Sequence, residues 1–200
     1  FASAARTLAG KTGSALVLGY VRAGFRIDIG GSWEPLGVRP DLSAWSKALG
    51  NGHAIASVTG NDAFRTAAQE VFMTGSFWCG AVPMAAALAT VRKLKSTDAI
   101  AHMVCLGDQL RSGIQAQADA RGLGLRQSGP VQMPMILFED DTDFAKGSLF
   151  TLTALKHGVY LHPWHNMFLS AAHTNADIEI ALNATQHGLE AVAQRFPPRI

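Results

Sequence analysis

An unbroken apolar run, Ala-Leu-Val-Leu, occupies residues 15–18 between residues that are typical of turns. A strand that is apolar at every position, instead of at alternate positions, is typical of a sheet covered on both faces. Such sheets are mostly parallel. The run therefore predicts a strand of a parallel sheet near the start of the chain.

The neighbouring segments alternate between helix and strand patterns. We expect a helix over residues 1–11, an irregular loop over 30–40, a strand and turn over 41–49, a strand over 54–59, a helix over 62–71 and an Ala-rich helix over 83–95. Gly10 and Gly13 close the first helix, and Asn61 or Asp62 caps the helix at 62–71. This alternation predicts an α/β layer over residues 1 to about 95.

The remainder has fewer strands and longer helices. Apolar residues fall mostly on one face of a helix that Gly122 ends, and two short strands surround the turn at 128–130. A helix over 144–157 ends at Gly158, and a last helix follows Asn175. The apolar stripe of this last helix consists of Ile178, Leu182, Thr185, Leu189 and Val192. Residues 96–200 are thus predicted to form a smaller α+β domain.

Composition excludes several classes of protein. Hydrophobic residues make up 48% of the chain and charged residues 16%, which is too apolar and too little charged for a disordered chain. The net charge is +2 without a cluster of Lys or Arg, which argues against a nucleic-acid surface. No apolar stretch is long enough to cross a membrane. We expect a soluble, cytoplasmic protein.

The two cysteines, Cys79 and Cys105, have neither disulfide-framework nor metal-site spacing, and we expect buried free thiols in a reducing compartment. His162 and His165 lie three residues apart without nearby carboxylates or thiolates, so we expect no metal there and interpret residues 162–165 as a substrate-facing or interface loop. The chain begins at Phe1, inside a predicted helix, and we expect it to be a fragment of a longer protein.

Residues 46–52, Ser-Lys-Ala-Leu-Gly-Asn-Gly, carry the strongest chemical signal. Lys47 follows a predicted strand and precedes a glycine turn, which places its amine at a sheet edge with room around it. A cofactor aldehyde that forms a Schiff base needs an amine in such a place. An isolated Lys-Ala-Leu-Gly is nevertheless more often a solvated lysine at a turn.

The order of the surrounding motifs favours the chemical interpretation. Val-Arg-Ala-Gly-Phe-Arg at 21–26, Gly-Val-Arg-Pro-Asp-Leu at 37–42 and the Lys47 segment occur in sequence, and Thr-Gly-Ser-Phe-Trp follows at 74–78. This set resembles class III pyridoxal-phosphate-dependent aminotransferases, in particular the glutamate-1-semialdehyde aminomutase branch. Residues 158–160 and 170–178 resemble the closing strand and terminal helix of that family.

The resemblance implies a fold-type I transferase, with residues 1–95 in the large cofactor-binding domain and 96–200 in the small domain. It implies that Lys47 holds pyridoxal 5'-phosphate and moves a proton between substrate and cofactor. It further implies that Val21 packs on the pyridine ring. Ser76, helped by Gly75 and less directly by Thr74, would bind the phosphate of a partner subunit's cofactor.

One departure concerns the strand before Val21. The family ends this strand in Asp-Glu, whereas this chain has Gly19-Tyr20. The missing Asp would keep the pyridine nitrogen protonated, and Gly19 cannot supply that charge-assisted hydrogen bond. Three interpretations remain: a non-catalytic relative, a chemistry that needs less charge withdrawal, or a register that differs by one residue. We predict weak or absent transamination.

The resemblance also implies partners. It covers only the carboxyl-terminal half of the family, so we expect the chain to work with a missing amino-terminal half or complementary chain, as a homodimer, or both. The expected substrate is a small amino acid or amino ketone, with amino-group transfer or a 1,2-shift as the reaction. The alternative is a structural or regulatory protein without activity.

Overall fold

The computed structural model describes residues 1–76, 78 and 80–197. The chain divides into two compact units, residues 1–100 and 101–200. None of the described helices is sufficiently long and apolar to span a membrane.

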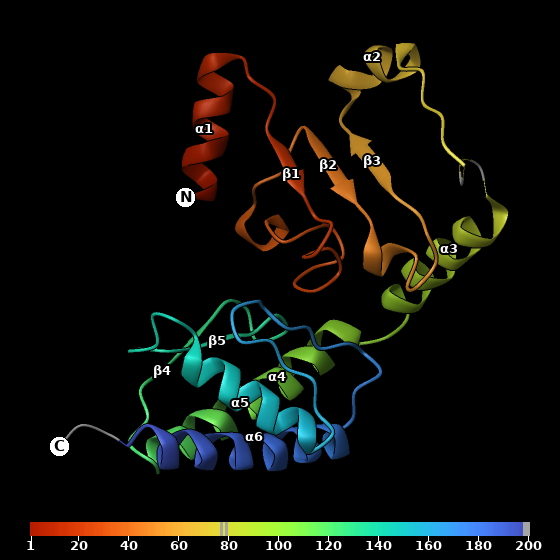
Figure 1. Ribbon diagram of the computed structural model, residues 1–200. Helices are drawn as coiled ribbons and strands as arrows, with labels where there is room; N and C mark the ends of the chain where they lie inside the picture. Colours follow the sequence, from red (N-terminus) through yellow and green to blue (C-terminus); the bar gives the residue numbers. More distant parts are fainter. Residues whose placement is uncertain (77, 79, 198–200) are drawn as a thin grey trace. The chain divides into compact units, whose positions relative to one another are not determined.

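The first unit is built on a three-stranded sheet (Figure 1). Its elements are α1 (Ala2–Thr12), β1 (Val17–Gly19), η1 (Glu34–Leu36), β2 (Leu42–Trp45), η2 (Lys47–Leu49), β3 (Ser57–Gly60), η3 (Asp62–Phe64), α2 (Arg65–Glu70) and α3 (Ala81–Lys95). β1 and β2 are parallel, with Gly19 opposite Ala44, and β3 is antiparallel to β2. The predicted α/β alternation is therefore present, with one antiparallel strand.

Of the predicted caps, Gly13 and Asn61 are present, whereas Gly10 lies inside α1 and does not end it. Gly13 terminates α1 with φ 66°, and its N–H donates to the carbonyl of Ala9. The Asn61 side chain accepts a hydrogen bond from Ala63 N at 3.1 Å, which starts the turn that leads into α2.

Burial in the first unit differs from the expectation for a sheet covered on both faces. Val17 of β1 is 58% exposed and Val58 of β3 is 67% exposed, and no described residue of α3 is buried. Leu18 packs against the buried residues Tyr20, Phe25 and Trp45, so the run at 15–18 is covered on one face of the sheet and exposed at Val17 on the other. In the described sheet β1 and β3 are also the two edge strands, and edge strands are available for pairing with other segments.

An aromatic cluster forms the buried centre of the first unit. Tyr20, Phe25 and Trp45 are its buried members, with ring centroids of Tyr20 and Trp45 4.7 Å apart and those of Phe25 and Trp45 5.0 Å apart. Gly31, at φ 121°, lies against Tyr20, because a Cβ at this position would approach the Tyr20 ring to 2.5 Å. The cluster fixes the face of the sheet that Tyr20 and Trp45 share.

The second unit packs helices on a two-stranded hairpin. α4 (Ala99–Asp119) starts at the junction, and β4 (Leu125–Ser128), β5 (Met135–Phe138), α5 (Ala145–Lys156) and α6 (Asn175–Arg195) follow. β4 and β5 are antiparallel. The predicted stripe of α6 faces the core, where Thr185, Leu189 and Val192 are fully buried. Thr174 and Asp177 form a capping box at the start of α6.

Two expectations for the second unit are wrong. Cys105 is an exposed free thiol, because the inward face of α4 at this point is occupied by Met103 and Leu106. Residues 158–160 form no strand. Gly158 N donates to Leu155 O and Val159 N to Ala154 O, so these amides cap α5 instead of pairing with a strand. Cys79 lies outside the described residues.

Candidate functional site

The candidate site lies at the carboxyl ends of β1 and β2. Because the two strands are parallel, their carboxyl ends meet at one edge of the sheet (Figure 1). Gly19 is the last residue of β1, and η2, which begins at Lys47, follows β2 after a single residue. Ligands of open α/β sheets characteristically bind outside this edge.

Lys47 has an exposed side chain and an unusual backbone. Its φ of 48° lies in the left-handed region, which a side chain with a Cβ seldom adopts. The Lys47 carbonyl accepts hydrogen bonds from Gly50 N at 3.1 Å and Asn51 N at 3.0 Å. Backbone conformations of this kind persist only where neighbouring contacts enforce them, and they are concentrated at functional sites.

Gly19 and Tyr20 place no acidic side chain at this edge of the sheet, where the family has an Asp-Glu pair. Gly19 is exposed, and a Cβ at this position would have no heavy atom within 4 Å. Tyr20 is 4% exposed and belongs to the aromatic cluster. Burial raises the pKa of the Tyr20 phenol, partly opposed by a hydrogen bond from the Trp33 backbone. The Tyr20 side chain is therefore part of the core, and Gly19 leaves open space at the edge.

Val21 follows directly and is 36% exposed. The resemblance implies that Val21 contacts a pyridine ring, and its exposure leaves the side chain available for that contact. Val21 comes two residues after the end of β1, and Lys47 comes two residues after the end of β2. The two residues thus follow the same edge of the sheet, where position 19 supplies no carboxylate.

The candidate phosphate ligands Thr74, Gly75 and Ser76 are exposed and lie in the segment between α2 and α3. The carboxyl-terminal part of α3, at Val91 and Leu94, packs with the cluster that adjoins the Lys47 turn. A helix of 15 residues is roughly 22 Å long. Ser76 precedes the other end of α3, so these three residues do not gather around Lys47 of the same chain. Phe77, in the same motif, lies outside the described residues.

Asp41 organises the start of β2, a role that the sequence did not reveal. One carboxylate oxygen accepts from Leu16 N at 2.7 Å and from Arg6 Nη1 at 2.8 Å, and the other accepts from Asn61 Nδ2 at 2.9 Å. These hydrogen bonds, first that of the Leu16 amide and then that of Arg6, lower the pKa of Asp41. The carboxylate joins α1, β1 and the end of β3 to the strand that leads to Lys47.

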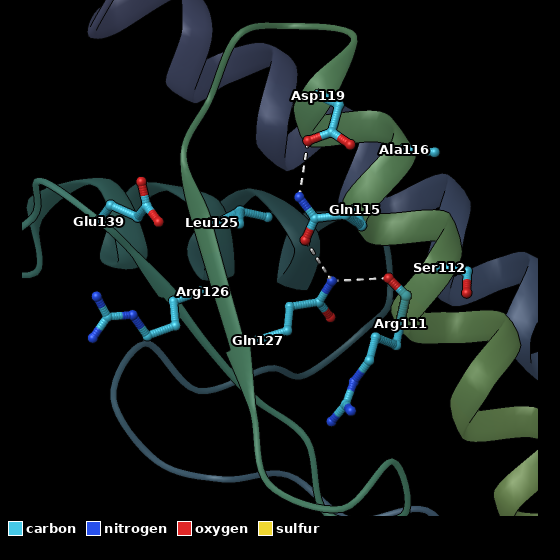
Figure 2. A pocket seen from close by; sticks show the side chains of 9 residues that line it. All are labelled: Arg111, Ser112, Gln115, Ala116, Asp119, Leu125, Arg126, Gln127 and Glu139. Atoms are coloured by element: carbon cyan, nitrogen blue, oxygen red, sulfur yellow. Dashed lines mark hydrogen bonds between the residues drawn. The ribbon is translucent and has the colours of Figure 1, made fainter.

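The second unit holds a polar cavity of about 650 Å³ between α4 and β4 (Figure 2). Gln127 Nε2 donates to the Arg111 carbonyl at 2.8 Å and to Gln115 Oε1 at 3.2 Å, and Gln115 Nε2 donates to Asp119 at 2.8 Å. Figure 2 shows this chain of amides along the cavity. It fastens the hairpin to the helix. The spacing of these residues on α4 is that of an ordinary polar face, so no pattern in the sequence indicates the cavity.

The loop at 160–168 carries the two histidines considered as metal ligands. The His162 and His165 rings are 5.6 Å apart, and the Trp164 ring lies 4.9 Å from that of His162. The Trp164 amide donates to His162 Nδ1 at 3.2 Å. Trp164 is 53% exposed. The arrangement is an exposed aromatic loop, and its expected role at a substrate or an interface stays a prediction.

Comparison with known proteins gives a consistent result. The family model for Aminotransferase class-III matches residues 1–189. The aminopentol aminotransferase of Sphingopyxis macrogoltabida is 47% identical over 98% of this chain and 46% of its own length. A glutamate-1-semialdehyde 2,1-aminomutase of Natranaerobius thermophilus is 29% identical over 94% of this chain and 47% of its own length.

A solved structure has the same fold. The FumI protein of Sphingopyxis sp. MTA144, in its PLP internal aldimine form, matches with a TM-score of 0.95 and 47% identity over 98% of this chain and 47% of that chain. This agreement confirms the fold-type I transferase fold that the sequence predicts. The chain spans about half the length of the relatives that it matches.

Proposed function

Because this chain belongs to the class III aminotransferase family, we propose that it forms the carboxyl-terminal part of a pyridoxal-phosphate-dependent aminotransferase. The observation that carries the proposal is the place of Lys47. Its exposed amine follows β2 at the carboxyl edge of the parallel pair, and its backbone is held in a left-handed turn. This is where a lysine that binds a cofactor aldehyde is needed.

Lys47 has two tasks in this proposal. Its amine would hold the cofactor covalently and, once the amine of the substrate has displaced it, would carry a proton between the substrate carbon and the cofactor. When bound, pyridoxal phosphate withdraws electrons from the substrate carbon that loses the proton. Val21 packs on one face of the ring and restricts its tilt.

The phosphate-binding role of Thr74, Gly75 and Ser76 requires a second subunit. These residues precede α3, whereas the Lys47 turn adjoins its other end. We therefore propose a homodimer in which residues 74–76 of one subunit bind the phosphate of the cofactor held by the other. We also propose that the exposed strands of the first unit pack against an amino-terminal half like the one that the relatives contain.

The reaction we propose is amino-group transfer between two compounds. The relative with 47% identity is named an aminotransferase, whereas the aminomutase with 29% identity is named for a shift within one substrate. Both reactions use the same lysine. The substrate is an amino compound, such as a small amino acid, an amino ketone or, by analogy with the name of the relative, an aminopentol.

A second function is favoured by Gly19. A protein without a carboxylate at this position cannot hold the pyridine nitrogen protonated through a charge-assisted hydrogen bond. Tyr20 is in the core and offers no replacement. The alternative is therefore a protein that binds the cofactor but transfers amino groups weakly or not at all, and that has a structural or regulatory role.

Lys47→Arg tests the first proposal in the intact protein. Arginine keeps the charge but forms no stable covalent bond with the cofactor aldehyde, so we expect loss of the near-visible absorbance of the adduct. The rate of the amino-transfer half-reaction should fall by about 10²- to 10⁴-fold. The control is Lys156→Arg at the end of α5, which should change neither quantity. Retention of the absorbance in Lys47→Arg would remove Lys47 from the mechanism.

Gly19→Asp distinguishes the two functions. A Cβ at position 19 would meet no heavy atom within 4 Å, so a side chain can begin there without a clash at its first atom. If its absence limits catalysis, Gly19→Asp should raise the half-reaction rate by at least about tenfold, the effect of roughly 1.4 kcal/mol of transition-state stabilisation. Pre-steady-state absorbance measures this rate. An unchanged rate in a protein that binds the cofactor normally would contradict the explanation based on Gly19.

A further inference from the structure

We propose that Ser46 is a positioning residue for Lys47, acting through a hydrogen bond that closes the turn in which the lysine lies. The inference rests on the proposed function, because it concerns the geometry with which Lys47 presents its amine. The half-buried Ser46 hydroxyl donates to the carbonyl of Ile55 at 2.9 Å. This bond joins the residue before Lys47 to the segment that leads into β3.

The turn needs such a bond because its backbone is strained. Lys47 at φ 48° and Asn51 at φ 46° both have left-handed backbones, and Gly52 follows at φ 101°. Within the turn, Leu49 N donates to Ser46 O at 3.1 Å, and His53 N donates to Gly50 O at 3.1 Å. These bonds are local, whereas the Ser46 hydroxyl bond connects the two arms of the turn.

The two arms lie in close contact. A Cβ at Gly50 would approach the carbonyl oxygen of His53 to 2.3 Å and Ile55 Cγ2 to 2.6 Å. The Ile55 carbonyl is therefore held beside the start of the turn by packing as well as by the Ser46 hydroxyl. Loss of the hydroxyl leaves the packing in place but removes the directional contact next to Lys47.

The consequence for Lys47 is geometric. The β2–β3 pairing fixes Trp45 opposite Ser57, and the Ser46–Ile55 bond extends this fixed frame by one further residue. The Lys47 side chain then leaves the backbone from a defined origin. Without the bond, Lys47 can relax toward the right-handed region, and the amine reaches the cofactor aldehyde from a wider range of positions.

The test compares Ser46→Ala and Ser46→Thr in the intact protein with pyridoxal phosphate. Threonine keeps the hydroxyl and suits the extended backbone of Ser46 (φ −164°). The measured quantity is the equilibrium constant of the covalent adduct, from its near-visible absorbance against cofactor concentration. We expect about a threefold to tenfold decrease for Ser46→Ala, the range for one lost hydrogen bond. Ser46→Thr should lie within about twofold of the unchanged protein.

Further variants separate the possible outcomes. Ser46→Cys, with a weaker donor of similar shape, should give an intermediate constant and replaces Ser46→Ala if that variant does not fold. Ser57→Ala, at the start of β3, is the matched control and should leave the constant unchanged. A lower melting temperature of Ser46→Ala with an unchanged adduct constant would show a purely structural bond and overturn the inference alone. Absence of any adduct in the unchanged protein would overturn the proposed function, and this inference with it.

Discussion

At the scale of single residues, the conformation of the chain around Tyr20 depends on a glycine. Gly31 has φ 121°, and a Cβ there would meet the Tyr20 ring at 2.5 Å. The sequence shows Gly30-Gly31 only as part of an irregular loop. The structure gives Gly31 a specific reason to be glycine, because any side chain would both strain the backbone and displace a core ring.

Gly31→Ala is therefore expected to destabilise the protein by about 2–4 kcal/mol, from backbone strain and overpacking together. The measurement is the free energy of unfolding in denaturant. Gly37→Ala is the matched control: Gly37 also has positive φ, at 66°, but a Cβ there meets nothing within 4 Å. The control should lose only about 1 kcal/mol. Equal losses for the two variants would mean that the contact with Tyr20 costs nothing.

Individual residues also show what the sequence could and could not predict. Lys47 is expected at a sheet edge because a strand pattern, a lysine and a glycine turn adjoin one another, and the structure has this arrangement. Its left-handed backbone and the Ser46–Ile55 bond were not predictable. A hydroxyl bond to a carbonyl nine residues away leaves no mark in a local pattern, because serine is common in turns for other reasons.

At the scale of secondary-structure elements, the sequence predicted the ends of helices and turns best, because capping residues act within a few positions of one another. Gly13 ends α1 and Asn61 caps the turn before α2 as predicted. The closing strand expected at residues 158–160 failed because it depends on a distant partner strand, which no local pattern specifies. The contacts of Asp41 with α1, β1 and β3 are likewise long-range, and the motif Pro40-Asp41 alone does not indicate them.

Asp41→Asn is expected to lower the free energy of unfolding at pH 7 by about 1–3 kcal/mol, because hydrogen bonds from Leu16 N and Arg6 to a charged acceptor are weakened. The folded-state pKa of Asp41 lies below its unfolded value. Its stabilising effect is therefore complete above the unfolded pKa of about 4 and declines as pH falls through the folded pKa. Denaturation curves between pH 7 and pH 2 should converge for the two proteins at the acid end. A constant difference over this range would exclude ionised Asp41 as the cause.

At the scale of the whole molecule, the most informative property is apolar surface that the chain leaves uncovered. Val17 and Val58 on the sheet and much of α3 are exposed, although Val91 and Leu94 of α3 pack against the aromatic cluster. The relatives are about twice as long as the chain. The parts of the fold that depend on those additional residues could not follow from this sequence, however well its own elements were predicted.

Chain 1–200 produced alone is expected to associate through β1 and β3, because both are edge strands of the described sheet and carry exposed valines. Co-production with the amino-terminal half of the aminopentol aminotransferase should give a complex that contains both segments, measured by native mass spectrometry with and without pyridoxal phosphate. Val58→Lys should reduce self-association, because a charged side chain on a strand opposes stacking of further chains. A chain that stays monomeric alone and forms no complex with the amino-terminal half would contradict this expectation.

Gly19 and Tyr20, which stand where the family has Asp-Glu, differ in how readily an acidic residue could replace them, because Tyr20 is buried and Gly19 is exposed. Position 19 is exposed, and a Cβ there would meet no heavy atom within 4 Å, so one substitution can introduce a side chain at this place. An acid at position 20 would have to replace a ring that contacts Trp45 and would leave a charge and a void in the core. The first of the two positions is therefore open to an acidic side chain within this chain, whereas the second is closed to one by the aromatic core.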